Sequence, residues 1–433
     1  MDYTAGENRT AQYRFRTGDQ ALVRQINLAV IMHHLREHAP ISRASLAEMT
    51  GLNKTTVSSL VRELIDRQFV REMGYESPGH GRGAGRLAML LTLDPAAGYI
   101  ISAEIGVDFL LVICTDFAPE VIWRHKEDIS PEMGQQYIIQ RLLALLRQAM
   151  DIGCQSCNSL LGVSIGLHGL VDQSSGTLLF APNLGWENVP LRSVLQEITN
   201  APVLLDNEGN LAALGEHYFG IAQGCKEVLY ITASVGLGGG LVHDGQVFGG
   251  VTGIGAEFGH MTMDPDGERC NCGNRGCWET QVSQRALFRY IRRGIGQGRM
   301  TLINELTGGN PAAITVPIVV EAAGGGDPLA LEALDTIGHH LGIGIASLVN
   351  ALNPEMVVFG GALSLAADFL LPVVNFELER RALRWTRQAT RVVITHHGLD
   401  ACVMGGVARL FQVTLAGPVS LPQANPGVFA IAG

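Results

Sequence analysis

The feature that most constrains the fold is a repeated unit in which an apolar run of strand length ends in a glycine-rich loop. It occurs at 160–172 (LLGVSIGLHGLVD), at 227–250 (EVLYITASVGLGGGLVHDGQVFGG) and at 355–364 (EMVVFGGALS). Residues 98–117 have the pattern of a β-hairpin of two long apolar strands, and 133–153 that of a helix. Such alternation predicts an α/β architecture. Because the unit recurs in both halves of this region, we expect two lobes with a cleft between them.

Length and composition indicate a chain of several globular domains. At roughly 100–200 residues per domain, 433 residues predict two to four of them. With 47% apolar and 17% charged residues, the composition excludes disorder over most of the length. The 53 glycines exceed the usual share of about 7%, which indicates many tight turns and close backbone approaches.

The sequence has the features of a cytoplasmic protein with no membrane segment. It contains no run of 18 apolar residues, and its first 20 residues lack the apolar core of a secretory signal. In the reducing cytoplasm, the eight cysteines are expected to be thiols or metal ligands.

The net charge of −10 is unevenly distributed. Residues 1–92 hold 12 Lys and Arg against 9 Asp and Glu, whereas the rest holds 19 against 32. A mildly basic head before an acidic body is typical of a nucleic-acid-binding domain attached to a body that does not bind nucleic acid. We therefore expect two parts, a DNA-binding domain at 1–93 and a ligand-binding body at 94–433.

Three helices are predicted in the head. The first covers about 19–38, with Leu22, Ile26, Val30 and Leu35 near one face, and Pro40 stops it. Ser42 is a candidate N-cap for a short helix that Gly51 ends, and Asn53 is a candidate N-cap for a helix over 54–68. The apolar residues of that third helix fall on one face, at Val57, Leu60, Val61, Leu64 and Ile65.

The second and third helices, joined by a tight glycine turn, predict a helix-turn-helix. In that motif the second helix enters the major groove of DNA. Its polar face predicts the DNA contacts, with hydroxyls and cations suited to phosphates and base edges: Lys54, Thr55, Thr56, Ser58, Ser59 and Arg62. The alternative is an ordinary three-helix unit with a solvated Ser/Thr face.

A candidate wing follows these helices. The segments 69–75 and 86–93 are strand-like and flank a Gly-rich loop, which predicts a β-hairpin. Arg82 and Arg86 stand on this flexible backbone, as contacts with the minor groove would require. Together the helices and the hairpin predict a winged helix-turn-helix; a plain surface loop is the alternative.

A zinc site is predicted in the body. His260, Cys270, Cys272 and Cys277 supply four ligands within 18 positions, as a tetrahedral zinc ion requires. Glycines at 267, 273 and 276 allow the chain to fold around the ion. The C-x-C-x4-C spacing differs from that of a zinc finger, which favours a structural site inside a larger body. The pair Cys154 and Cys157 forms a C-x-x-C motif without a matching partner pair, so we assign it no metal or redox role.

Several of these segments resemble the ROK family (repressors, open reading frames and sugar kinases). The segment 253–279 resembles its zinc signature and 204–220 its sugar-site segment; 163–172, 181–191 and 234–253 also fit. The resemblance covers about 94–415, and the head resembles that of the family's repressors of the xylose-operon type. It implies an actin-like, two-lobed α/β body of the sugar-kinase type, which binds a monosaccharide between its lobes and forms a homodimer or a tetramer.

The resemblance also implies the residues of the sugar site. They are polar or glycine positions expected to line the cleft: Gly169, Asn183, Asn207, Glu208, Glu257, His260 and Glu279. His260 would bind zinc through one ring nitrogen and a sugar hydroxyl through the other, so that the metal fixes the geometry of the sugar site.

The kinases of the family phosphorylate sugars with ATP, and three segments of this chain depart from what that chemistry needs. Where the kinases carry D-x-G-G-T-K, this chain has 104–109, in which Val107 replaces a glycine and Asp108 would repel a phosphate. At the second phosphate loop, Val235 replaces a hydroxyl residue. Glu208 stands at the position of the aspartate that serves as the general base and is one methylene longer.

These observations predict a sugar-responsive transcriptional regulator, most simply a repressor, and not an enzyme. Its partners would be operator DNA and a monosaccharide effector, xylose or another aldose. The alternatives are an active ATP-dependent sugar kinase with an added regulatory head and a zinc-stabilised protein whose head binds another protein. The identity of the sugar, the operator sequence and the direction of the response are left open by the sequence.

Overall fold

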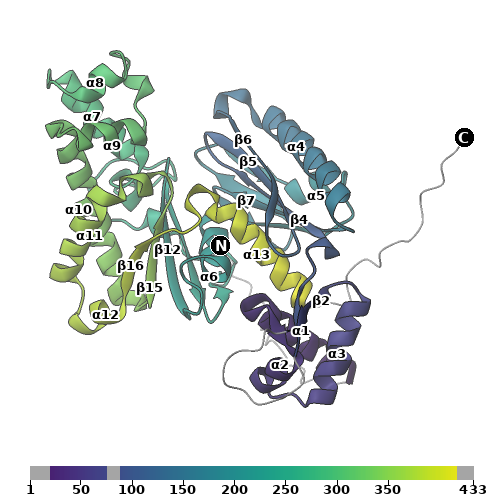
Figure 1. Ribbon diagram of the computed structural model, residues 1–433. Coiled ribbons are helices and arrows are strands. Elements are labelled where there is room, and N and C mark those ends of the chain that lie inside the picture. The colour runs from purple at the N-terminus through teal and green to yellow at the C-terminus, as the bar shows by residue number, and fades with distance from the viewer. Residues whose placement is uncertain (1–19, 76–87, 417–433) are drawn as a thin grey trace, which may run out of the picture. The chain divides into compact units, whose positions relative to one another are not determined.

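The computed structural model of the protein describes residues 20–75 and 88–416 (Figure 1). The described chain forms two compact units: a head that runs to Asp94 and also takes in the end of the last helix from Val413, and a body over Pro95–Gln412. Each unit has its own secondary structure and its own buried side chains.

The head consists of three helices and a small antiparallel sheet. Its elements in chain order are α1 (Gln20–His38), β1 (Ile41–Ser42), α2 (Arg43–Thr50), α3 (Lys54–Asp66), β2 (Val70–Tyr75) and β3 (Met89–Leu93). The sheet has the order β1-β3-β2, and β2 and β3 form the predicted wing hairpin. The winged helix-turn-helix arrangement is thereby confirmed.

The predicted caps of the head helices are present. The Ser42 side chain accepts a hydrogen bond from the Ser45 amide, and the Asn53 side chain accepts one from the Thr56 amide. Gly51 ends α2 with a left-handed φ of 70°, which favours glycine. The third helix is two residues shorter than predicted, because Gln68 has a φ of 63°.

The buried face of α1 differs from the prediction. The side chains that pack inside are those of Leu28, Ile31, Met32 and Leu35, a regular i, i+3, i+4, i+7 set. Ile26 was expected on this face but is 53% exposed. It precedes Leu28 by two residues and therefore points to nearly the opposite side of the helix.

The first lobe of the body is built on a five-stranded sheet of order β11-β7-β4-β5-β6. Neighbours β4, β7 and β11 are parallel, whereas β4, β5 and β6 form antiparallel hairpins. The helix α4 packs against β4 and β5, and a three-stranded sheet, β10-β9-β8, follows β7. The elements of this lobe are β4 (Tyr99–Ile105), β5 (Phe109–Asp116), β6 (Val121–Asp128), α4 (Gln135–Ser156), β7 (Leu160–Leu167), β8 (Leu170–Asp172), β9 (Thr177–Ala181), β10 (Trp186–Val189), α5 (Leu191–Gln196), β11 (Val203–Asn207) and the later α13 (Ala401–Ala416).

The second lobe is built on another five-stranded sheet, of order β14-β13-β12-β15-β16. Its strands are β12 (Glu227–Ala233), β13 (Leu237–His243), β14 (Gln246–Val247), β15 (Met356–Gly360) and β16 (Arg391–Ile394). Its helices are α6 (Glu208–Phe219), α7 (Gln284–Gly296), α8 (Leu302–Leu306), α9 (Val316–Gly324), α10 (Pro328–Leu352), α11 (Ala367–Arg381) and α12 (Arg384–Ala389). The predicted two-lobed α/β body is confirmed, with a separate apolar core in each lobe.

A pair of glycines brings α6 directly against β13. A Cβ atom on Gly240 would lie 2.4 Å from the carbonyl oxygen of Gly209, and one on Gly209 would lie 2.4 Å from that of Gly239. Real Cβ atoms do not approach backbone oxygens so closely, so these positions need glycine. The contact sets the position of Glu208, the first residue of α6.

We therefore expect Gly240→Ala to destabilise the body by about 1–3 kcal/mol, because the added methyl group would push α6 off the sheet. The measurement is the midpoint of urea unfolding followed by circular dichroism. Gly296→Ala is the control, since a Cβ there meets open space and the change should stay within about 1 kcal/mol of the parent. An unchanged midpoint for Gly240→Ala would contradict the close contact.

Candidate functional site

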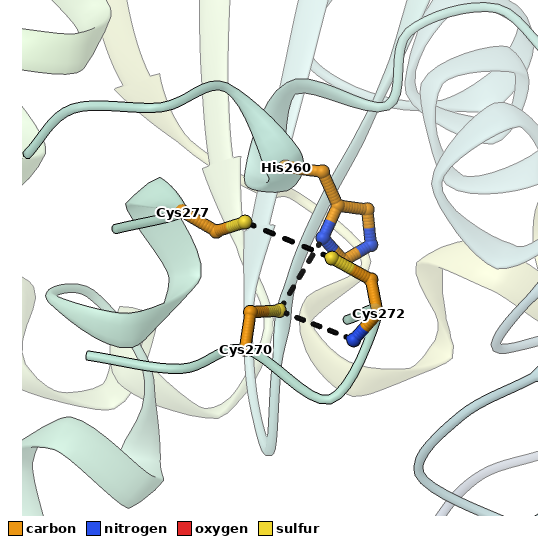
Figure 2. Close-up of side chains that lie close together, drawn as sticks. All are labelled: His260, Cys270, Cys272 and Cys277. Atoms are coloured by element: carbon orange, nitrogen blue, oxygen red, sulfur yellow. Dashed lines mark hydrogen bonds between the residues drawn. The ribbon is translucent and has the colours of Figure 1, made fainter. Parts of the chain in front are cut away.

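The four predicted metal ligands lie together in the second lobe (Figure 2). One ligand atom from each of His260, Cys270, Cys272 and Cys277 lies within 4.8 Å of the other three. Cys270 Sγ is 3.7 Å from His260 Nδ1, and Cys272 Sγ is 3.7 Å from Cys277 Sγ. A tetrahedral ion with zinc–sulfur bonds of about 2.3 Å holds two sulfurs about 3.8 Å apart. The spacing and the donor set therefore fit a tetrahedral metal ion.

A glycine allows the loop to bring these ligands together. Gly276 has a φ of 64°, and a Cβ atom there would lie 1.5 Å from the carbonyl oxygen of Asp264. The Gly276 carbonyl in turn accepts hydrogen bonds from the amides of Met263 and Asp264. The loop thus closes on itself immediately before Cys277.

A polar pocket lies beside the metal cluster. It encloses about 600 Å³ of space that is partly open to solvent. The structure brings all seven predicted sugar-site residues to its wall, namely Gly169, Asn183, Asn207, Glu208, Glu257, His260 and Glu279. His168, Pro182, Thr232, Ser234, Leu237, Ala256 and glycines of the 236–239 loop complete the lining.

His260 and Glu279 are shared by the pocket and the metal cluster. His260 Nδ1 faces the cysteine sulfurs, whereas its Nε2 lies 4.0 Å from Glu257 Oε2. Glu279 Oε1 accepts a hydrogen bond of 2.8 Å from the Cys270 thiol. Any ion that ordered the cysteine loop would therefore also order one wall of the pocket.

Asn207 serves chiefly to position other groups. Its side-chain oxygen caps α6 by accepting from the amides of Gly209 and Asn210, and its Nδ2 donates to the Gly169 carbonyl at 3.2 Å. A hydrogen bond from Asn207 to a sugar would therefore use the second N–H of its side-chain amide.

Asn183 links the first lobe to the second. Its side-chain oxygen accepts hydrogen bonds from Asn271 Nδ2 at 2.9 Å and from Arg285 at 2.8 Å. Asn271 lies in the loop that carries the three cysteines, and Arg285 lies in α7. Asn183, predicted to contact a sugar, therefore also connects the pocket to this loop. Neither partner was singled out from the sequence, because an arginine in a helix carries no local signal of such a contact.

Two pocket carboxylates are in unusual surroundings. Burial raises the pKa of Glu257 to about 7, with further contributions from the nearby charges of Glu208 and Glu279. Burial also raises the pKa of Glu208, while the positive charge of His168 acts in the opposite direction. Glu208 Oε2 is buried and has no hydrogen-bond partner within the described part of the chain.

His168 is a pocket residue that sequence reasoning missed. Its Nε2 donates a hydrogen bond of 2.8 Å to Glu104 Oε1, and its Nδ1 lies 3.6 Å from Glu208 Oε1. Burial lowers its pKa, but the adjacent charge of Glu208 and the hydrogen bond and charge of Glu104 outweigh burial and raise the pKa to about 9. The sequence did contain a feature that could have identified it: a histidine directly before Gly169, in the loop that ends a buried strand.

Both loops that were compared with kinase phosphate loops make contacts within the chain. In 104–109, Val107 is buried, and the Phe109 ring covers Gly106 so closely that a Cβ there would meet it at 2.6 Å. In the second loop, Ser234 Oγ accepts a hydrogen bond from the Ala362 amide.

The predicted DNA-contact face lies at the N-terminal half of α3. Lys54, Thr55, Ser58, Ser59 and Arg62 are exposed there, whereas Thr56 is half-buried. The other two predicted contacts, Arg82 and Arg86, lie outside the described residues.

The fold and the site together define a two-lobed α/β body of the sugar-kinase type that carries a winged helix-turn-helix. The chain belongs to the ROK family, whose model matches residues 100–413. A winged helix-turn-helix DNA-binding model matches residues 30–71.

Individual relatives agree with this assignment. The xylose repressor of Caldicellulosiruptor bescii is 33% identical over 401 residues, which cover 93% of this chain and 99% of the relative. A ROK family transcriptional regulator, a homologue of the E. coli Mlc protein, has a similar structure, with a TM-score of 0.77 and 28% identity over 92% of this chain and 98% of its own. A ROK family glucokinase from Streptomyces griseus, in complex with glucose and AMPPNP, matches with a TM-score of 0.65 and 30% identity over 71% of this chain and 98% of its own.

Within residues 20–75 and 88–416, no helix has the length and apolar character needed to cross a bilayer.

The link between Asn183 and α7 leads to a prediction about local motion. We expect Arg285→Ala to raise the hydrogen-exchange rates of the 181–185 turn severalfold, because the turn loses a charge-assisted hydrogen bond. Hydrogen-exchange mass spectrometry measures this. Arg292→Ala on the same helix is the control, since Arg292 bonds the Pro311 carbonyl instead. Equal hydrogen-exchange rates of the 181–185 turn in the two variants would show that the hydrogen bond between Asn183 and Arg285 does not restrain this turn.

Proposed function

We propose that the protein is a sugar-responsive transcriptional repressor. Its head, residues 1–93, binds operator DNA, and its body, residues 94–433, binds a monosaccharide effector. In support, a winged helix-turn-helix precedes a ROK body on one chain, and a relative aligned over almost its whole length is named a xylose repressor.

The observation that carries the proposal is a polar pocket next to loops unsuited to phosphate. Its wall combines amide, carboxylate and imidazole groups, which suit the many hydroxyls of a sugar. Buried Val107 and exposed Asp108 stand where a nucleotide phosphate would need close backbone amides. A site that binds a sugar but holds no phosphoryl donor is suited to sensing.

For the effector we propose xylose or another aldose. The relative's name supports xylose. A sensor also has no need of the primary C6 hydroxyl that a hexokinase phosphorylates, so a pentose is a sufficient ligand.

We further propose that His260, Cys270, Cys272 and Cys277 hold a structural zinc ion. When bound, it supplies a four-coordinate cross-link between parts of the 260–277 loop. This chain's residues then do the binding: the loop places Glu279 and His260 Nε2 on the pocket wall.

The switch we propose is reciprocal. A homodimer presents two α3 helices to the half-sites of a pseudo-palindromic operator. If sugar binding favours a body conformation that spaces the heads wrongly, then sugar and DNA weaken each other's binding by the same factor, with a coupling of typically about 1–3 kcal/mol.

The second candidate function is an ATP-dependent sugar kinase, favoured by the similarity to the S. griseus glucokinase. A coupled assay with xylose or glucose and ATP separates the two functions. Sugar-dependent ADP formation at ordinary kinase rates, about 1–100 per second, would establish the kinase and displace the sensor.

The main experiment is a titration of the full-length protein with genomic operator fragments, with and without sugar. We expect xylose, or another aldose of a monosaccharide panel, to change operator affinity by about 5–150-fold. Arg62→Ala should weaken DNA binding and reduce its salt dependence while leaving sugar affinity intact. Arg67→Ala, at the other end of α3, is the matched control. DNA affinity that no monosaccharide alters would rule out the sensor.

The metal assignment has its own test. We expect mass spectrometry to detect stoichiometric zinc in the parent protein and none in Cys272→Ala, and the variant should have lower thermal stability and lower sugar affinity. Cys154→Ala, which changes an exposed cysteine of α4, should keep the metal. Full zinc content in Cys272→Ala would show that the ligand set is wrong.

A further inference from the structure

His168 occupies a position between two buried carboxylates. It follows β7, whereas Glu104 lies in β4 and Glu208 begins α6. Glu104 and Glu208 are only 4% and 8% exposed. Two carboxylates buried so deeply need a positive partner or a shared proton. The imidazole is the group in contact with both.

The two oxygens of Glu208 have different surroundings. Oε1 lies 3.6 Å from His168 Nδ1. It also faces Gly238, where an added Cβ atom would lie 2.7 Å from it. Oε2 is the buried oxygen for which the described residues provide no hydrogen-bond partner. Because Glu208 lines the pocket, its carboxylate is an acceptor for a ligand that brings a hydrogen-bond donor.

Several charged or titratable groups surround His168. Glu104 from β4, Asp108 from the following turn and Glu208 from α6 act on it directly. Cys402 of α13 interacts with both Glu104 and Glu208 and is a neutral thiol, since burial raises its pKa. The Phe109 ring of β5 meets His168 edge-on at 6.4 Å, and Lys126 Nζ lies 4.7 Å from the centre of that ring. The surroundings of the imidazole are thus predominantly acidic.

We propose that His168 determines the ligand specificity of the pocket: lying between Glu104 and Glu208, it positions the Glu208 carboxylate to accept a hydrogen bond from a hydroxyl of an uncharged monosaccharide. This inference rests on the proposed sensor function and names the class of ligand that the sensor accepts. His168 acts through Glu208 and is therefore a positioning residue.

The same cluster selects against phosphorylated ligands. One imidazolium between two carboxylates has a net charge of −1; Asp108 and Glu279 add negative charge nearby, and Glu257 adds more as pH rises above about 7. A phosphate dianion brought into this surrounding is repelled, and the repulsion is strong where water is largely excluded. A neutral sugar has no such penalty and can donate a hydrogen bond to the Glu208 carboxylate.

The pH dependence follows from the raised pKa of His168. In an unfolded or ligand-excluding state, an imidazole has a pKa near 6.5, whereas in the cluster its pKa is about 9. The stabilisation from the imidazolium is therefore complete below about pH 6.5 and is lost as pH rises through about 9. The contribution of His168 to sugar affinity should therefore be lost as pH rises through about 9.

The experiment is calorimetry of the full-length protein with xylose, glucose and glucose 6-phosphate between pH 7 and 10. At pH 7, His168→Gln should weaken binding of the neutral sugar by about tenfold or more, because an amide keeps a hydrogen bond but carries no charge. It should also abolish the loss of affinity above pH 9. His243→Gln is the control, since it removes a histidine–carboxylate pair with Glu227 outside the pocket. Glucose 6-phosphate should bind the parent at least about tenfold more weakly than glucose.

The outcomes distinguish this inference from the proposed function. If the parent protein binds neither xylose nor glucose nor any other monosaccharide of the panel, the sensor function fails and the inference with it. If the parent binds a sugar and His168→Gln binds it with the same affinity and the same pH profile, only the inference is overturned.

A measurement on the unaltered protein covers the case in which the variant does not fold. In an NMR titration, the His168 ring should show a pKa near 9, and sugar should shift its resonances. A ring that titrates near 6.5, or that does not respond to a bound sugar, would overturn the inference.

Discussion

The close contact between α6 and β13 is the constraint on which the site depends. Gly209 and Gly240 bring the backbones of the helix and the strand together, with no room for a side chain on either. Asn207 then caps α6 and ties it to Gly169 of the first lobe. As a result, Glu208 is held at the wall of the pocket by backbone packing, and its own side chain is free to serve a ligand.

Buried acidic groups dominate the pocket, and the protein compensates for them in two places. Leaving several carboxylates away from water is strongly unfavourable unless they are paired or protonated. On one side His168 lies between Glu104 and Glu208; on the other, Glu279 accepts from Cys270 and Glu257 faces His260. The acidic groups that favour a neutral polyol also disfavour phosphate.

The sequence predicted local features well. The caps at Ser42 and Asn53 and the turn at Gly51 depend on hydrogen bonds within a few residues, so residue type and spacing were sufficient. The four predicted metal ligands lie close together for the same reason, since they belong to one loop. The seven pocket residues came from the family resemblance, and the structure places all of them in the lining of one pocket. Ile26 was misplaced because apolar character alone does not give the phase of a helix.

What the sequence by itself determined is the class of fold, the head with its recognition helix, and the donor set of the metal cluster, because these follow from periodicity and short-range spacing. Only the tertiary structure decided that His168 lies between Glu104 and Glu208, residues 64 and 40 positions away from it, and that Asn183 reaches Arg285. Such contacts join strands and helices whose adjacency depends on sheet order and on close packing at glycines. A local sequence pattern does not encode such contacts. The groups that shift the pKa of a buried charged residue are its neighbours in space, whatever their distance along the chain.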